Sequence, residues 1–235
     1  MKEELVKKIL KDTEVGYDLI CEKFSQTRSR FWRGLGFISK FAKKNSNILD
    51  FGCGNGRLVE IFIDKDIKYV GVDVSEGLIN LAKKNVAGLR KSRDIQFLKI
   101  ESEFKKLPFP SDFFDSIYSI AVFHHLPSNE LRLNVASELY RLVKKDGFVI
   151  ITVWDLWQSR YWRSVFKNWK DKFFGKSELD ANDCYISFKD NSGQVFNRFH
   201  HAFTKNSLKK LFQKSGFKIV MCKKIDGNIV LVGKK

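Results

Sequence analysis

A carboxylate and three glycines alternate at the end of a short apolar segment of this chain, residues 48–51. The four residues are Asp50, Gly52, Gly54 and Gly56. A second apolar segment, residues 68–72, is followed directly by Asp73. In a parallel sheet, glycines after one strand let the backbone approach a ligand, and an acid after the next strand binds ribose hydroxyls. The pattern therefore predicts a site for a nucleoside-type cofactor.

The glycine spacing differs from that of dinucleotide-binding proteins. The pattern here is Asp-x-Gly-x-Gly-x-Gly, whereas the dinucleotide fingerprint is Gly-x-Gly-x-x-Gly and cradles a pyrophosphate. A cofactor without a pyrophosphate fits the shorter spacing better. The sequence therefore favours S-adenosylmethionine (SAM) over NAD.

The elements that must position these residues alternate between strands and helices. Apolar segments predict strands at residues 48–51, 68–72, 95–100, 114–120, 148–153, 217–222 and 229–232. Helices are expected at residues 57–63, from Ser75, from Ser128 through Lys145 to Gly147, and at 205–214. This alternation indicates a mostly parallel sheet with right-handed crossovers and helices on both faces. Only a short turn joins the last two strands, so they must pair antiparallel.

The fold class is therefore predicted to be α/β and Rossmann-like, with seven strands and an antiparallel last strand. Residues 1–235 are expected to form a single domain with two additions. Residues 1–45 form a helical cap over the cofactor mouth, and residues 154–203 form an aromatic insertion after the fifth strand. Four of the five tryptophans lie in this insertion, interleaved with arginines and lysines. Such rings suit unpaired RNA bases, although packing in a small satellite core also explains most of them individually.

The charge of the chain predicts an anionic partner. Forty-three Lys and Arg residues against 27 acids give a formal net charge of +16, and residues 205–235 hold nine lysines and one acid. Such a field attracts nucleic acid, and a general lysine bias is the alternative. Four scattered cysteines predict neither a disulfide framework nor a metal site. With no apolar leader and no membrane span, a cytoplasmic location is expected.

Four further segments carry a resemblance to a known family. They are residues 24–28 with Trp32, residues 119–125, residues 153–154 and residues 197–203. With the glycine loop, they resemble the tRNA wobble-uridine carboxymethyl (5-carboxymethyluridine) methyltransferases, which are class I SAM-dependent methyltransferases and include the methyltransferase half of the animal AlkB-type fusion protein. The family's Arg-Tyr-Tyr-His is here Arg198-Phe199-His200-His201, so two phenolic hydroxyls are missing.

The resemblance implies a role for each candidate residue. The three glycines would pass under the methionine part of SAM, Asp50 would face its ammonium group, and Asp73 would bind its ribose. Glu101 or Glu103 would contact the adenine, and Ala121 would pass beside the cofactor. The remaining candidates are Arg28, which would bind the SAM carboxylate or an RNA phosphate, and the catalytic residues His124, Arg198 and His201. His125 would either act beside them or be a buried structural histidine.

The implied reaction is methyl transfer from SAM to the carboxymethyl group of wobble uridine 34, which leaves S-adenosylhomocysteine. The implied partners are a tRNA anticodon stem-loop and a small zinc-binding activator subunit that covers the sheet edge near the third strand. Two other functions remain open from the sequence. One is a methyltransferase for a small quinone-like or lipid-like molecule, and the other is a non-catalytic scaffold that binds SAM and RNA.

Overall fold

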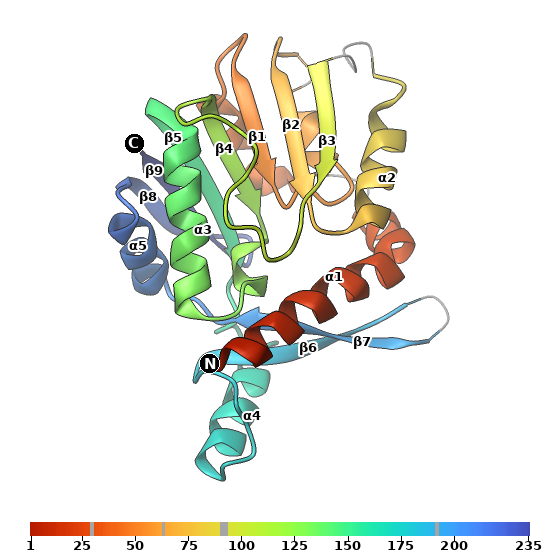
Figure 1. The fold of residues 1–235 in the computed structure, drawn as a ribbon, viewed down its shortest axis with the longest axis vertical. Coiled ribbons are helices and arrows are strands. Elements are labelled where there is room, and N and C mark those ends of the chain that lie inside the picture. Colours follow the sequence, from red (N-terminus) through yellow and green to blue (C-terminus); the bar gives the residue numbers. More distant parts are fainter. Residues whose placement is uncertain (29–30, 63, 90–93, 191–192) are drawn as a thin grey trace.

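The computed structural model describes residues 1–28, 31–62, 64–89, 94–190 and 193–235. Its strands are β1 (Asn47–Phe51), β2 (Lys68–Asp73), β3 (Ile95–Lys99), β4 (Phe114–Ile120), β5 (Val143–Trp154), β6 (Asp183–Lys189), β7 (Val195–His201), β8 (Lys218–Ile225) and β9 (Asn228–Lys234). Seven of them form one sheet in the order β3-β2-β1-β4-β5-β9-β8 (Figure 1), and β6 and β7 form a separate pair.

The predicted strand directions are confirmed. The strands β1 to β5 pair parallel to one another, whereas β9 pairs antiparallel to both β5 and β8. Asp226 and Gly227 form the turn between β8 and β9, and both have positive φ angles. A turn this short leaves the chain no room for a crossover, so β9 must return beside β8.

Helices cover both faces of the sheet, as the sequence predicts. The helical elements are α1 (Glu3–Gln26), η1 (Arg33–Phe41), η2 (Arg57–Phe62), α2 (Glu76–Val86), η4 (Phe123–His125), α3 (Asn129–Leu142), α4 (Trp162–Phe173) and α5 (Lys205–Lys214). Neighbouring side chains of β1 point to opposite faces. Leu49 packs with side chains of α3 and α5, whereas Ile48 packs with α2, η1 and η2.

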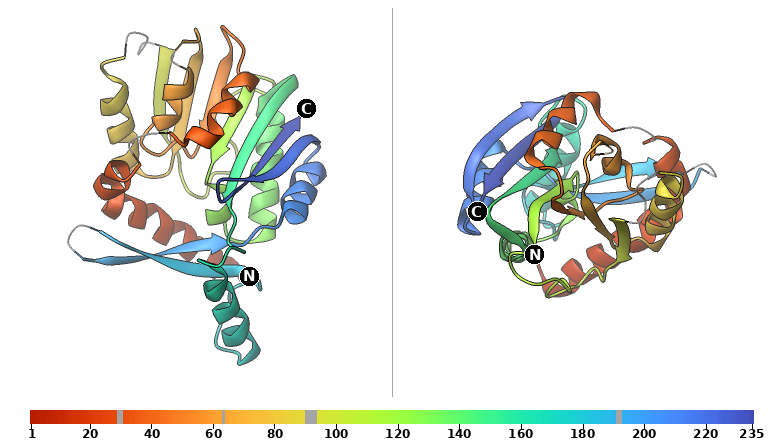
Figure 2. Two further views of the ribbon diagram at one scale, coloured as in Figure 1. Left: turned by 180° about the vertical axis from the view of Figure 1, so that it is seen from behind. Right: turned by 90° about the horizontal axis from the view of Figure 1, so that it is seen from above.

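The element α1 and the hairpin β6–β7 lie across the carboxyl ends of the parallel strands (Figures 1 and 2). They touch at Gly16 of α1, where an added Cβ would lie 2.0 Å from the ring of Phe196 in β7. The helix α4 projects away from the sheet below them (Figure 1). Among the described residues, no helix has both the length and the apolar character that crossing a membrane requires.

Two local predictions need correction. The helix expected to continue through Lys145 ends at Leu142, because Val143 already pairs with Phe114 as the start of β5. The segment expected to be a helix at residues 57–63 is the short 3-10 helix η2 over its described part. The insertion, which shows no clear periodicity in the sequence, contains one helix and one hairpin. The caps at Ser75 and Ser128 are confirmed, because each hydroxyl accepts a backbone N–H three residues later.

Candidate active site

A cavity lies at the carboxyl ends of the central strands, between β1 and β4, where the chain's connections lead to opposite sides of the sheet. Ligands of open α/β sheets bind at this type of crevice. Its volume is about 1190 Å³ when the space open to solvent is counted.

The glycine loop forms the floor of the cavity. Gly52 and Gly54 line it, with φ angles of +77° and +54°. A Cβ on Gly52 would lie 2.2 Å from Val122, so only glycine fits that position. Gly56 also has a positive φ, but it packs against Phe97 and does not line the cavity. Two of the three predicted glycines therefore line the cavity, and the third packs inside the loop.

Asp73 closes the side of the cavity nearest β2. Its Oδ2 accepts a hydrogen bond from the Gly54 N–H at 2.8 Å, and its Oδ1 accepts one from the Ser75 N–H at 3.0 Å. Burial raises the pKa of Asp73, while these backbone donors oppose the shift. Each carboxylate oxygen can accept a further hydrogen bond, so Asp73 retains acceptor sites for ligand hydroxyls.

Asp50 is buried below the loop and lines the cavity. The Tyr69 hydroxyl donates to its Oδ2, whereas its Oδ1 has no hydrogen-bond partner among the described residues. Burial raises the pKa of Asp50 to about 7, although the Tyr69 hydrogen bond and the Arg57 charge oppose the shift. An unpartnered carboxylate oxygen in a cavity wall suits a positively charged ligand group.

The Asp50 shift predicts a specific effect on stability. Between pH 4 and pH 7 the folded state binds this proton more tightly than the unfolded state, so stability declines as pH rises through that range. The Asp50→Asn variant resembles the protonated form and should not lose stability in this way as the pH rises. Urea unfolding should show its advantage over the wild type growing by up to about 1.4 kcal/mol per pH unit, with no further growth above pH 7. Stability curves that stay parallel would contradict this assignment.

The helix α1 and the turn after it form one wall of the cavity, through side chains that include Tyr17 and Phe24 of the helix and Arg28 of the turn. The Tyr17 hydroxyl contacts His125 Nε2 at 2.9 Å, and Asp18 accepts hydrogen bonds from the start of α2. The Arg28 guanidinium lies 4.4 Å from the centre of the Phe24 ring, and burial lowers its pKa. Sequence reasoning identified Arg28 but missed Tyr17 as part of the site.

Among the residues that the structure describes, three guanidinium groups line the cavity against two carboxylates: Arg28, Arg57 and Arg198. The Arg57 guanidinium lies 3.9 Å from the centre of the Trp32 ring, and burial lowers its pKa to about 10. Arg198 is almost fully buried between the rings of Trp154 and Phe188, and its Nε has no hydrogen-bond partner among the described residues. The cavity therefore offers cations to anionic ligand groups.

Three buried histidines meet beside Arg198: His124, His125 and His200. One ring nitrogen from each of them lies within 4.8 Å of the other two. The Nδ1 atoms of His125 and His200 contact backbone carbonyls at 2.8 and 2.9 Å. A carbonyl can only accept, so both Nδ1 atoms carry the proton. Burial lowers the pKa of all three rings and keeps them neutral.

The ring of His124 has the opposite tautomer. The backbone N–H of Trp154 donates to its Nδ1 at 3.2 Å, so the proton of the neutral ring is on Nε2. This Nε2–H has no acceptor among the described residues. Since Tyr17 occupies His125 Nε2, only His200 Nε2 keeps a free lone pair in this part of the described chain. One free lone pair beside the Arg198 guanidinium is poorly suited to hold a metal cation.

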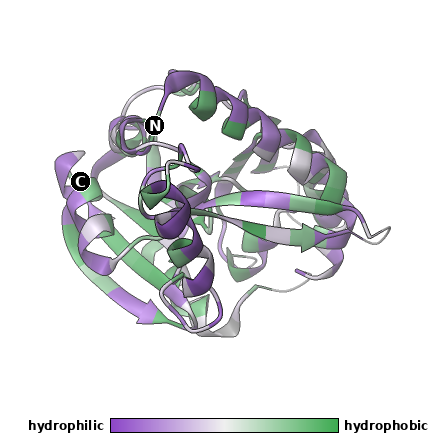
Figure 3. Cartoon of the chain, turned by 90° about the horizontal axis from the view of Figure 1, so that it is seen from below, coloured by the Kyte–Doolittle hydropathy of each residue, from purple (hydrophilic) through white to green (hydrophobic). Residues whose placement is uncertain are grey.

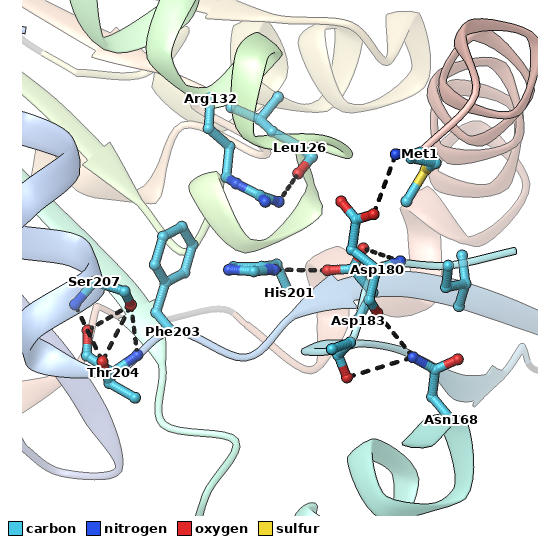
Figure 4. Close-up of polar contacts among 12 residues, drawn as sticks. Met1, Leu126, Arg132, Asn168, Asp180, Asp183, His201, Phe203, Thr204 and Ser207 are labelled. Atoms are coloured by element: carbon cyan, nitrogen blue, oxygen red, sulfur yellow. Dashed lines mark hydrogen bonds and ion pairs between the residues drawn. The ribbon is translucent and has the colours of Figure 1, made fainter. Parts of the chain in front are cut away.

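Ala121 lines the cavity directly after β4, where its φ is +62° and its N–H donates to the Thr152 carbonyl. Two other candidates lie elsewhere. Glu101 is exposed, and neither it nor Glu103 lines the cavity, whereas Ser102 between them does. His201 points to Asp183, with its Nδ1 2.6 Å from the carboxylate (Figure 4), and it does not line the cavity.

A model of a methyltransferase domain family matches residues 24–221 of this chain. The chain is 32% identical over 162 residues to the tRNA (carboxymethyluridine(34)-5-O)-methyltransferase alkbh8 of Xenopus tropicalis, covering 69% of this chain and 23% of that protein. It is 34% identical over 138 residues to the enzyme of that name in Arabidopsis thaliana, covering 59% and 31%. It is also 30% identical over 208 residues to a putative methyltransferase of Encephalitozoon cuniculi, covering 87% and 86%. The chain spans less than a third of the first two relatives.

Solved structures show the same fold. A SAM-dependent methyltransferase from Methanosarcina mazei superposes with a TM-score of 0.71 at 17% identity, covering 88% of this chain and 98% of that chain. A methyltransferase from Haloferax volcanii, solved in complex with the Trm112 methyltransferase activator, superposes with a TM-score of 0.66 at 15% identity, covering 94% and 96%. The predicted Rossmann-like methyltransferase fold is confirmed.

Proposed function

This chain belongs to the methyltransferase domain family, and from that membership we propose that it is a SAM-dependent tRNA methyltransferase that esterifies the carboxymethyl group of a wobble uridine. Its relatives in Xenopus and Arabidopsis carry the name of this activity. The observation that carries the proposal is a pair of unpartnered donors in the cavity wall, Arg198 Nε and His124 Nε2–H. Two unpartnered donors on side chains that line the same cavity suit a carboxylate acceptor.

The residues of the cavity fit SAM. Asp73 keeps free acceptor sites for the ribose hydroxyls, and the unpartnered Oδ1 of Asp50 suits the ammonium group. Arg28 and Arg57 provide cations for the carboxylate of the methionine part. The adenine contact is assigned to neither Glu101 nor Glu103, since both point away from the cavity.

The protein's contribution to the reaction is to hold the acceptor and exclude water. When bound, SAM supplies a methyl group on a positively charged sulfur. A carboxylic acid with a pKa near 4 is already ionised at pH 7, so the chain needs no strong general base. Arg198 and His124 would orient the carboxylate, and correct alignment can contribute up to roughly 7–11 kcal/mol. The walls of Tyr17, Phe24 and Trp154 exclude water, which otherwise stabilises the separated charges of the reactants.

Two other functions predict different behaviour. A lipid-like acceptor would need an apolar pocket beside the cofactor, whereas this wall presents Arg198, His124 and His125. A non-catalytic scaffold would bind SAM and RNA without transferring the methyl group. The decisive experiment is mass spectrometry of wobble nucleosides from tRNA incubated with the protein and SAM. A methyl ester on carboxymethyluridine is expected, and an unchanged nucleoside pool would overturn the proposal.

An activator subunit is the second proposed partner, and β3 is its proposed docking edge. This strand lies at the end of the sheet and pairs with β2 on its other side. Leu98 is exposed there, beside a hollow lined by residues of α2 and β3. An uncovered apolar edge strand is a site for strand addition. Co-expression with a small zinc-binding subunit of the Trm112 type should increase the soluble yield, and an equal yield without it would count against this edge.

A further inference from the structure

The structure separates the aromatic insertion into a packed part and an exposed part. Trp154, Trp157 and Tyr161 pack around the buried cluster that contains Leu156 and Val165. Five other rings, here called the α4 ring surface, are exposed by 38 to 86%: Trp162, Phe166, Trp169, Phe173 and Phe174. The satellite core therefore accounts for the first group of rings and leaves the second unexplained.

The ring surface consists of rings in contact with each other. Trp162 and Phe166 lie 5.0 Å apart between ring centres, and Phe166 and Trp169 lie 4.8 Å apart. Phe173 and Phe174 form a second pair at 5.3 Å. Exposed apolar patches of this kind usually mark an interaction site. In Figure 3, apolar and polar residues alternate along α4.

The opposite side of α4 is firmly attached to the molecule. Val165 is fully buried, and the Asn168 side chain donates to the Asp180 carbonyl at 2.8 Å and accepts from the Ser177 hydroxyl. The helix that carries the exposed rings is therefore held in place before any ligand arrives. A rigid platform of this kind lowers the entropy cost of binding.

The charge around these rings indicates what binds them. Residues 160–176 contain six cations and one acid, Asp171, which pairs with Lys167. The cations are Arg160, Arg163, Lys167, Lys170, Lys172 and Lys176. Rings alternating with cations match a chain whose flat bases alternate with phosphates.

The ring surface begins at the cavity wall. Trp154 lines the cavity and stacks on Tyr161, with ring centres 5.7 Å apart and planes 26° apart. The next residue, Trp162, is the first ring of the exposed surface. A strand of RNA whose modified nucleotide enters the cavity would therefore pass directly onto α4.

We propose that the α4 ring surface binds the unpaired nucleotides next to the modified one, with the rings stacking on bases and the cations contacting phosphates. This inference rests on the proposed tRNA substrate and adds the part of the protein that holds the flanking loop. The proposed ligand is single-stranded RNA, because the cations among these rings would contact its phosphates. An apolar protein surface, such as that of a second copy of this chain, would offer these cations no anionic partner.

The test separates rings from charges in the full chain. One variant, Trp162→Leu with Phe166→Leu, keeps the apolar character but removes the rings, and a second, Arg163→Gln with Lys170→Gln, keeps the rings but removes charge. Binding of a fluorescent anticodon stem-loop RNA would be measured over a series of salt concentrations. The ring variant should lose about fivefold to a hundredfold in affinity with an unchanged salt slope. The charge variant should lower the slope of log K against log salt by about 1.4, since each phosphate contact contributes ~0.7.

Methylation assays keep this inference distinct from the proposed function. The ring variant should raise KM for tRNA at unchanged kcat and unchanged adenosylhomocysteine affinity. If the wild type methylates tRNA and the ring variant binds RNA as tightly as the wild type does, the role proposed for the α4 ring surface is wrong and the proposed function stands. If the wild type neither binds RNA nor methylates it, both fail. A ring variant that keeps its RNA affinity but loses binding to phosphatidylcholine–phosphatidylserine vesicles, or loses dimerisation, would overturn the RNA-binding role of the α4 ring surface in favour of a membrane or a second copy of the chain.

Discussion

Replacing Arg198 by glutamine should reduce kcat/KM for tRNA methylation by about 10²–10³-fold, the range measured when one preorganised donor to a reacting oxygen is removed. The guanidinium lies in the cavity wall between two rings, and its Nε has no partner among the described residues. Affinity for adenosylhomocysteine, measured by calorimetry, should stay within about threefold of the wild type, since Asp73 and the glycine loop hold that ligand. Arg198→Lys should retain part of the activity, because the charge remains while the planar fork is lost.

A matched control is Arg132→Gln. Arg132 is also a buried arginine, but it donates to the Leu126 carbonyl and does not line the cavity. Its loss should lower the melting temperature and leave the kcat of the folded enzyme nearly unchanged. Equal losses of methyl transfer and adenosylhomocysteine affinity in Arg198→Gln would show that Arg198 supports the cavity as a whole and does not hold the acceptor.

The parts of the site that follow one another in the chain could be predicted from the sequence. Asp50, Gly52 and Gly54 lie in one strand and its loop, and Asp73 ends the neighbouring strand. Parallel pairing of adjacent strands brings these residues to one edge of the sheet whatever the rest of the chain does.

The residues brought by distant elements could not be predicted in this way. Tyr17 and Arg57 reach the cavity because of how α1 and η2 pack, which no local pattern encodes. The adenine-contacting acid was predicted on residue type alone. In the turn after β3, Ile100, Ser102 and Phe104 line the cavity, whereas Glu101 and Glu103 are exposed to solvent. His201 shows the same alternation, since Arg198 and His201 lie on opposite faces of β7.

Replacing Asp73 by asparagine should weaken adenosylhomocysteine binding by at least about a hundredfold. Two charge-assisted hydrogen bonds to the ribose would be lost, and each contributes about 1.5–3 kcal/mol. The amide group of asparagine would also face the Gly54 N–H, which now donates to Asp73 Oδ2 at 2.8 Å. One of these two donors would then lack an acceptor, so the loop itself would shift.

The control for Asp73→Asn is Glu76→Gln, which removes the same charge from an exposed position three residues later. Long-range attraction between charges is screened by salt, whereas a direct hydrogen bond is not. If Asp73 acts by direct contact, the two variants should therefore differ in adenosylhomocysteine affinity at both low and high ionic strength. Calorimetry with adenosylhomocysteine at two salt concentrations measures this difference. A similar loss of affinity in both variants would mean that the site attracts its cofactor by long-range charge alone, and the ribose contact assigned to Asp73 would be wrong.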